Sequence, residues 1–219
     1  MKASVILPAY NEENNIAAVL DAVPAKYEII VVDDGSTDRT LEIAKSYGCN
    51  CIRFAKNTGK GAACVAGARL AANENLVFID SDGQLDAKEI PLLLRALRNC
   101  DLAVGTRSIE DIPVQRRISN NFAKAVLSKA AGKRLGDVLC GFRAIRKGNF
   151  LSLHLKKKRY EIETEMIIKA VRRGLKIKEV PISVRYGIGS SMPFADSMKV
   201  ASYLIGEAMQ SSYKNTIKQ

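Results

Sequence analysis

Two aspartates stand two positions apart directly after the apolar run Leu76-Val77-Phe78-Ile79, in the segment Asp80-Ser81-Asp82-Gly83-Gln84. The run predicts a buried strand that ends at Asp80. Because residues i and i+2 of an extended segment point the same way, the carboxylates of Asp80 and Asp82 can aim at one point. These two hard oxygen ligands suit Mg²⁺ or Mn²⁺ completed by phosphate oxygens and water. A structural alternative, with Asp80 as a helix cap and Asp82-Gly83 as a turn, stays open.

The chain before Asp80 alternates between short apolar strands and amphipathic helices. Strands are expected at residues 3–8, 28–32 and 51–54, and each is followed by a segment with helical spacing. This alternation predicts an α/β domain whose mostly parallel central sheet is flanked by helices. Ligands bind outside the carboxyl ends of such strands, so the loops after Pro8, Val32 and Asp80 are expected to converge on one edge.

Polar side chains in the first two of these loops could contact a nucleoside. Tyr10 offers a ring face to a base, although a half-buried loop tyrosine is the simpler alternative. Glu12 could accept hydrogen bonds from a base or ribose. Of the neighbouring pair Asp33-Asp34, we expect Asp34 to face the ligand and Asp33 to be structural.

The loop Asn57-Thr58-Gly59-Lys60-Gly61 opens the third helix but lacks the spacing of a phosphate-binding P-loop. Gly59 and Gly61 are expected to allow close packing at the start of the helix. Lys60 could still reach a phosphate.

Length and composition indicate one domain, or one domain with a tail. The 219 residues are 47% hydrophobic, and no apolar run approaches the length of a membrane span. Met1 leads directly into a strand, without the pattern of a signal peptide. The five cysteines have neither zinc spacing nor an even count, which favours reduced, packed thiols and a cytoplasmic location.

The net charge of +11 is unevenly distributed. Residues 1–106 hold 11 Lys and Arg against 14 Asp and Glu, whereas residues 107–185 hold 20 against 7. Residues 116–127 predict a basic amphipathic helix that could lie on an anionic membrane, although an ordinary core-packed helix is nearly as well supported. The basic half could also bind nucleic acid, but the acidic strand ends and the absence of tryptophan count against that function.

Several segments, in this order and spacing, together resemble family 2 glycosyltransferases of the GT-A fold, and most of all the dolichyl-phosphate mannose synthase-like group that glycosylates polyprenyl phosphates. They are Leu7-Pro8-Ala9-Tyr10-Asn11-Glu12, Val31 to Asp38, Asp80 to Gln84, Val104-Gly105-Thr106-Arg107, Asp137 to Arg143, Glu165-Met166, Glu179-Val180-Pro181-Ile182 and Arg185-Tyr186-Gly187. The resemblance covers roughly residues 3–190.

The resemblance implies a metal-dependent, inverting transfer of mannose or glucose from a GDP- or UDP-sugar to a polyprenyl phosphate. Metal ligands would be Asp80, Asp82 and Gln84, and Asp82, Arg107 and Arg185 would serve catalysis. The donor would be held by Pro8, Tyr10, Glu12, Val32, Asp34, Asp80, Ser81, Asp82, Arg107 and Arg185. A divalent ion and arginines at a departing diphosphate would stabilise its growing charge.

The acceptor decides whether a general base is needed. A lipid monophosphate has a second pKa of about 6 and is already a nucleophile at neutral pH. In the alternative, a family 2 enzyme acting on a sugar hydroxyl, the first base candidates would be Glu163 and Glu165. For Glu163, however, a carboxylate facing the dipole of a helix N-terminus is the preferred interpretation. A catalytically idle regulatory subunit is disfavoured because the motif residues are intact.

The expected organisation is a GT-A domain at 1–190, divided into a donor half (1–106) and an acceptor half (107–190), and a helical tail at 191–219. Residues 195–210 predict one amphipathic helix. Many relatives continue into transmembrane hairpins, whereas this chain stops at Gln219. It is therefore expected to act as a peripheral protein at the cytoplasmic membrane face. Its last helix could dimerise or dock on a separate membrane subunit.

Overall fold

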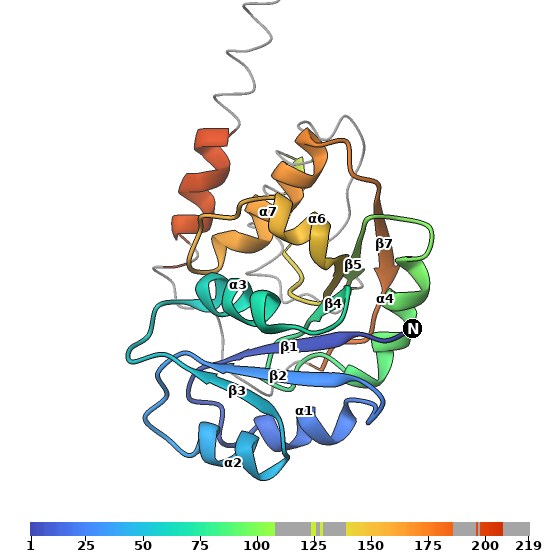
Figure 1. The fold of residues 1–219 in the computed structure, drawn as a ribbon. Helices are drawn as coiled ribbons and strands as arrows, with labels where there is room; N and C mark the ends of the chain where they lie inside the picture. The colour runs from blue at the N-terminus through green and yellow to red at the C-terminus, as the bar shows by residue number, and fades with distance from the viewer. Residues whose placement is uncertain (108–123, 126–127, 129–138, 186–195, 197, 208–219) are drawn as a thin grey trace, which may run out of the picture.

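A seven-stranded sheet forms the centre of the computed structural model, which describes residues 1–107, 124–125, 128, 139–185, 196 and 198–207 (Figure 1). The strands are β1 (Ser4–Ala9), β2 (Glu28–Asp33), β3 (Asn50–Arg53), β4 (Asn75–Phe78), β5 (Leu102–Thr106), β6 (Arg143–Arg146) and β7 (Ile177–Pro181). Their order is β3-β2-β1-β4-β6-β5-β7, and only β6 pairs antiparallel with its neighbours. The predicted α/β fold with a mostly parallel sheet is confirmed.

Helices cover both faces of the sheet (Figure 1). The α-helices are α1 (Ile16–Ala22), α2 (Thr40–Ser46), α3 (Lys60–Leu70), α4 (Ile90–Ala96), α6 (Lys147–Ser152) and α7 (Glu161–Arg172), and a 3₁₀ turn, η1, spans Ala87–Glu89. A further helical segment covers residues 198–207. The four predicted strands up to Asp80 lie within one or two residues of the observed ones.

The core consists of two apolar layers, one on each face. Along β1, Val5 and Leu7 pack into the layer with α1 and α4, whereas Ile6 packs into the layer with α3, α6 and α7. This alternation follows from the two-residue period of a strand. All of β1 is buried, as expected for a central parallel strand covered on both faces.

The predicted tail helix lies only partly within the described residues. Val200 and Leu204 of segment 198–207 are buried in the layer with α7, whereas Met198 and Ile205 are exposed. The predicted basic helix at 116–127 falls almost entirely outside the described residues. Among the residues that are described, no helix is both long enough and apolar enough to cross a membrane.

Helix α3 packs unusually close to the sheet because it presents Gly67 to β1. A Cβ atom at Gly67 would lie 2.6 Å from Cγ2 of Ile6 and 3.2 Å from Cγ2 of Val32. We therefore predict that Gly67→Ala lowers the free energy of unfolding by about 1 to 3 kcal/mol through overpacking, although alanine favours helices. Urea denaturation would measure the change.

Gly206→Ala is the matched control, because Gly206 is exposed in segment 198–207 and a Cβ there would meet nothing within 4 Å. It should leave stability unchanged or raise it by up to about 1 kcal/mol. Equal effects of the two substitutions would contradict the close approach of α3.

Candidate active site

The carboxyl ends of β1, β2 and β4 are tied together by hydrogen bonds. The backbone N–H of Asp34 donates to the Ala9 carbonyl at 2.8 Å, and the Ser81 hydroxyl donates to the Pro8 carbonyl at 2.8 Å. The loops after these strands therefore converge on one edge of the sheet, as the alternation of elements predicts. Ser81 is buried, and its hydroxyl fixes the Asp80 segment against β1.

Asp80 lies beside two charged side chains that are distant in sequence. Nζ of Lys60, at the start of α3, is 2.5 Å from Oδ1 of Asp80 and 2.5 Å from Oε1 of Glu163, in the first turn of α7. The side chains of Lys60 and Glu163 are only 12% and 10% exposed, whereas that of Asp80 is 27% exposed. A single ammonium group thus bridges two carboxylates, one of which is open to solvent.

The surroundings of Asp82 disfavour the negative charge on its carboxylate. Burial and the nearby charge of Asp80 raise the pKa of Asp82 to about 7, against a partial opposing effect of the Gln84 backbone N–H, which lies 3.0 Å from Oδ1 of Asp82. Glu12 adds further negative charge nearby. The edge of the sheet at Asp82 therefore favours an added cation.

A hard divalent ion fits this donor set. Asp80, Asp82 and the Gln84 amide would supply oxygen ligands, which Mg²⁺ and Mn²⁺ prefer. Within the described part of the chain, no group of three or more His, Cys, Asp or Glu side chains is arranged to hold a metal. The remaining ligands would then come from water or from a phosphate-bearing substrate, which matches the habit of Mg²⁺ to share its shell with both.

The nucleoside candidates differ in what they can reach. The side chain of Tyr10 is exposed and that of Glu12 is buried, where it accepts a hydrogen bond from Nδ2 of Asn15 at 2.8 Å. Pro8 lies within β1. Val32 is fully buried under α3, so only its backbone could contact a nucleotide.

Asp34 is engaged by the loop that precedes α3. Its carboxylate accepts the backbone N–H groups of Thr58 at 2.6 Å and Gly59 at 2.7 Å. Burial raises the pKa of Asp34, and these two hydrogen bonds oppose that rise. The predicted contact of Asp34 with a nucleoside stays a prediction, whereas its role in holding the Thr58-Gly59 loop is visible in the structure.

The two predicted arginines come after strands β5 and β7, on the other half of the sheet. Arg107 directly follows β5 and is half-buried. The side chain of Arg185 is 72% exposed and 3.9 Å from Oδ2 of Asp86, and its backbone N–H donates to the Gln84 carbonyl at 2.8 Å. That backbone bond places Arg185 at the Asp80–Gln84 segment, which its sequence position does not reveal.

Glu163 and Lys60 are the residues whose roles sequence reasoning missed. Glu163 does stand in the first turn of a helix, but its side chain pairs with Lys60 and is not simply a solvent-facing partner of the helix dipole. Glycines on both sides of Lys60 were the available signal. A Cβ at Gly59 or Gly61 would lie within 2.5 Å of the Lys158 or Lys157 carbonyl, which confirms the predicted close packing.

Glu165, a base candidate for a hydroxyl acceptor, is buried and fully engaged. Its carboxylate accepts the backbone N–H groups of Lys156 and Lys157 and lies 2.8 Å from Nζ of Lys169. The arrangement fixes the segment that leads into α7. Glu165 is thus placed to hold the backbone and not to remove a proton from a substrate.

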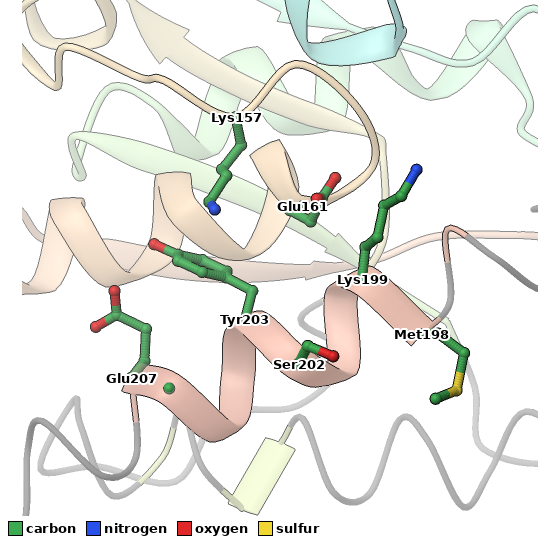
Figure 2. A pocket seen from close by; sticks show the side chains of 8 residues that line it. Lys157, Glu161, Met198, Lys199, Ser202, Tyr203 and Glu207 are labelled. Atoms are coloured by element: carbon green, nitrogen blue, oxygen red, sulfur yellow. The ribbon is translucent and has the colours of Figure 1, made fainter.

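A groove of about 580 Å³ lies on the other side of the first turn of α7 (Figure 2). Lys157, Glu161 and Lys199 line it, and Nζ of Lys157 lies 4.5 Å from the ring centre of Tyr203. Glu161 faces the groove while Glu163 faces Lys60, because residues two apart on a helix point to different sides. None of the residues that line the groove belongs to the Asp80 site.

The match to a family model places the chain in a known class. The model described as glycosyl transferase family 2 matches residues 4–153, which include the Asp80 segment, Lys60 and Arg143. The chain belongs to this family and is therefore a glycosyltransferase. Its α/β fold is the one described above.

Two curated relatives are named for transfer to lipid phosphates. A dolichol-phosphate mannosyltransferase of Pyrococcus furiosus is 32% identical over 200 residues, covering 84% of this chain and 56% of the relative. An undecaprenyl-phosphate mannosyltransferase of Micrococcus luteus is 29% identical over 230 residues, covering 95% of this chain and 91% of the relative.

Among solved structures, the chain is similar to glucosyl-3-phosphoglycerate synthase of Mycobacterium tuberculosis in complex with Mn²⁺, UDP and glucosyl-3-phosphoglycerate. The TM-score is 0.78 at 25% identity, over 94% of this chain and 80% of that enzyme. The GT-A fold that the sequence resemblance implies is confirmed by this similarity.

The bonds of Asp34 lead to a testable prediction. Asp34→Asn should lower the free energy of unfolding by about 2 to 3 kcal/mol, because one of the two N–H groups, at half-buried Thr58 or buried Gly59, would face an amide NH₂ in place of an oxygen. Urea denaturation would give the stability change, and hydrogen exchange at Thr58 and Gly59 would locate it.

Glu42→Gln is the control, because Glu42 is an exposed acid on α2 whose ion pair, with Arg39 just before the helix, is also exposed. It should leave the denaturation midpoint unchanged. Unchanged stability and exchange in Asp34→Asn would contradict the structural role of Asp34.

Proposed function

We propose that this glycosyltransferase moves a hexosyl group, mannose or glucose, from a GDP- or UDP-sugar to a polyprenyl phosphate, with inversion and in dependence on Mg²⁺ or Mn²⁺. The observation that carries the proposal is the pair Asp80 and Asp82 at the carboxyl end of β4, where burial and the charge of Asp80 raise the pKa of Asp82. The names of the Pyrococcus and Micrococcus relatives support the lipid phosphate acceptor.

The donor would bind across the ends of β1, β2 and β4. Tyr10 would stack on the base, while Pro8, Glu12, Val32 and Asp34 would shape the nucleoside pocket through backbone or carboxylate contacts. Ser81 would lie beside the diphosphate. The complex of the similar mycobacterial enzyme with Mn²⁺ and UDP supports a divalent ion at a nucleoside diphosphate.

Asp80, Asp82 and Gln84 would hold the ion. When bound, it would neutralise the diphosphate oxygens, which gain charge as the bond to the sugar breaks. Arg107 and Arg185 would place guanidinium groups at phosphates of the donor or acceptor, since planar guanidinium groups pair with two phosphate oxygens at once. The chain would thus promote transfer mainly by placing positive charge where negative charge develops.

The acceptor phosphate would need orientation and not deprotonation, because its second pKa is about 6. The structure of α7 supports this acceptor over a sugar hydroxyl. Of the two predicted base candidates, Glu165 is engaged by two backbone N–H groups and Lys169, and Glu163 is paired with Lys60. A hydroxyl acceptor would require one of them to give up these partners.

The place of the reaction would be the cytoplasmic face of a membrane, where the lipid acceptor resides. The excess of basic residues in 107–185 would attract anionic lipid headgroups. The enzyme would bind peripherally, directly or through a membrane subunit, and the exposed Met198 and Ile205 of the tail helix could contribute to a dimer contact.

The first activity measurement tests donor, metal and acceptor together. Purified enzyme would be incubated with radiolabelled GDP-mannose or UDP-glucose, a short polyprenyl phosphate, and Mn²⁺, Mg²⁺ or EDTA. We expect metal-dependent lipid-linked product with one donor. Asp82→Asn should lower kcat/KM by about 100-fold or more, because the metal would lose a negatively charged ligand and would stabilise the departing diphosphate less well.

Asp21→Asn is the matched control, since Asp21 is an exposed acid on α1 and loses the same charge. It should retain full activity. Polyprenol without a phosphate should accept no sugar. Transfer to a glycan hydroxyl but not to polyprenyl phosphate would establish the alternative acceptor, and metal-independent transfer would refute the metal site.

A further inference from the structure

Lys60 lies in a cradle that four residues from three segments of the chain form around its ammonium group. Asp80 and Glu163 each approach Nζ to 2.5 Å, and the ring centre of Tyr160 lies 5.7 Å away. Gly141 closes the remaining side, where a Cβ atom would lie 2.7 Å from Nζ and 2.5 Å from Oδ2 of Asp80. Only glycine leaves room for the Lys60–Asp80 pair at this position.

A buried arginine holds the cradle together. Arg143 is 1% exposed, and its guanidinium donates to the Cys140 carbonyl at 2.9 Å and to the Glu163 carbonyl. These bonds join the Gly141 segment to the first turn of α7. One side chain thereby fixes the positions of Glu163 and the Gly141 segment relative to each other.

Lys60 is enclosed between two carboxylates. Its side chain is only 12% exposed, and Asp80 and Glu163 each pair with its ammonium group. The ammonium group therefore remains a full positive charge in contact with Asp80. It occupies an oxygen of the same carboxylate that the proposed metal site needs.

We propose that Lys60 is a built-in competitor of the divalent ion, and that Glu163 is the positioning residue that receives its ammonium group when the ion binds Asp80 and Asp82. The inference rests on the metal site of the proposed function. Without the ion, Lys60 neutralises Asp80, so the two strand-end carboxylates are not left without a cation. With the ion bound, the Lys60–Glu163 pair keeps the ammonium group nearby while Asp80 turns to the metal.

Because two carboxylates surround one ammonium group, the exchange leaves no buried charge without a partner. Lys60 keeps one full ion pair in either state, so no buried charge is left alone. The solvent exposure of Asp80 (27%) gives the ion a path to the carboxylate, whereas Glu163 (10%) is shielded and retains Lys60. The cradle thus sets how tightly the site holds a metal before the donor arrives.

Mn²⁺ titration followed by electron paramagnetic resonance of the free ion tests the proposal without any turnover. It would be run with the whole chain, in the presence and absence of UDP or GDP. The double variant Lys60→Met/Glu163→Gln removes one charge of each sign, and we expect it to bind Mn²⁺ on the order of tenfold more tightly than wild type. Glu163→Gln alone should weaken binding severalfold, because Asp80 is then the one carboxylate among the described residues that pairs with Lys60.

Three further measurements make the result unambiguous. Lys45→Met, on the exposed face of α2, removes a lysine charge away from the site and should leave Mn²⁺ affinity unchanged. Thermal unfolding of each variant without metal separates misfolding from altered binding. In the Lys60→Met background, Glu163→Gln should lose most of its effect on affinity, as expected for residues that act as a pair.

The outcomes separate this proposal from the proposed function. If wild type binds no Mn²⁺ with or without nucleotide, the proposed metal dependence fails and the competition fails with it. If wild type binds Mn²⁺ but the folded double variant binds it equally or more weakly, the competition is refuted while the metal site stands. Equal Mn²⁺ affinity in folded Glu163→Gln and wild type would also refute the role of Glu163.

Discussion

Repulsion between two carboxylates at the end of one strand is the constraint on which this site depends. Asp80 and Asp82 are carried to the centre of the sheet edge by β4, between β1 and β6, where burial makes every unbalanced charge costly. Positive charge must therefore reach this edge from elsewhere in the chain or from solution. Lys60 supplies part of it, while burial and the charge of Asp80 still raise the pKa of Asp82.

The fold brings the balancing groups together by close backbone approach. Glycines at 59, 61, 67 and 141 each face an atom that a Cβ would approach within 3 Å, so α3, the 157–159 segment and the start of β6 meet with little side-chain volume between them. Arg143 and Asp34 then fix these segments by bonds to backbone groups. The buried ion pairs depend on these small residues, because the charged groups must lie close together to remain paired in a buried site.

The sheet and its binding edge could be predicted from the sequence because they follow from local periodicity. Strand ends at Pro8, Val32 and Asp80 are visible as apolar runs that stop at polar residues, and parallel pairing brings them to one edge. The partners of these residues could not be predicted in the same way. Lys60 and Glu163 are 103 positions apart, and Asp34 turns toward Thr58 and Gly59 through loop geometry that no periodic pattern encodes.

The distribution of carboxylates also explains which chemistry the edge can support. Asp34, Glu163 and Glu165 are each held by amide or ammonium donors within 3 Å, so none of the three combines exposure with a free oxygen. The carboxylates with access to added cations are Asp80 and Asp82. A site of this kind acts on charge more readily than on protons, since its acids are arranged to bind cations and its lysine is held protonated. The proposed acceptor, a phosphate that arrives already ionised, would match such a site, because its activation would require orientation beside positive charge and no proton transfer.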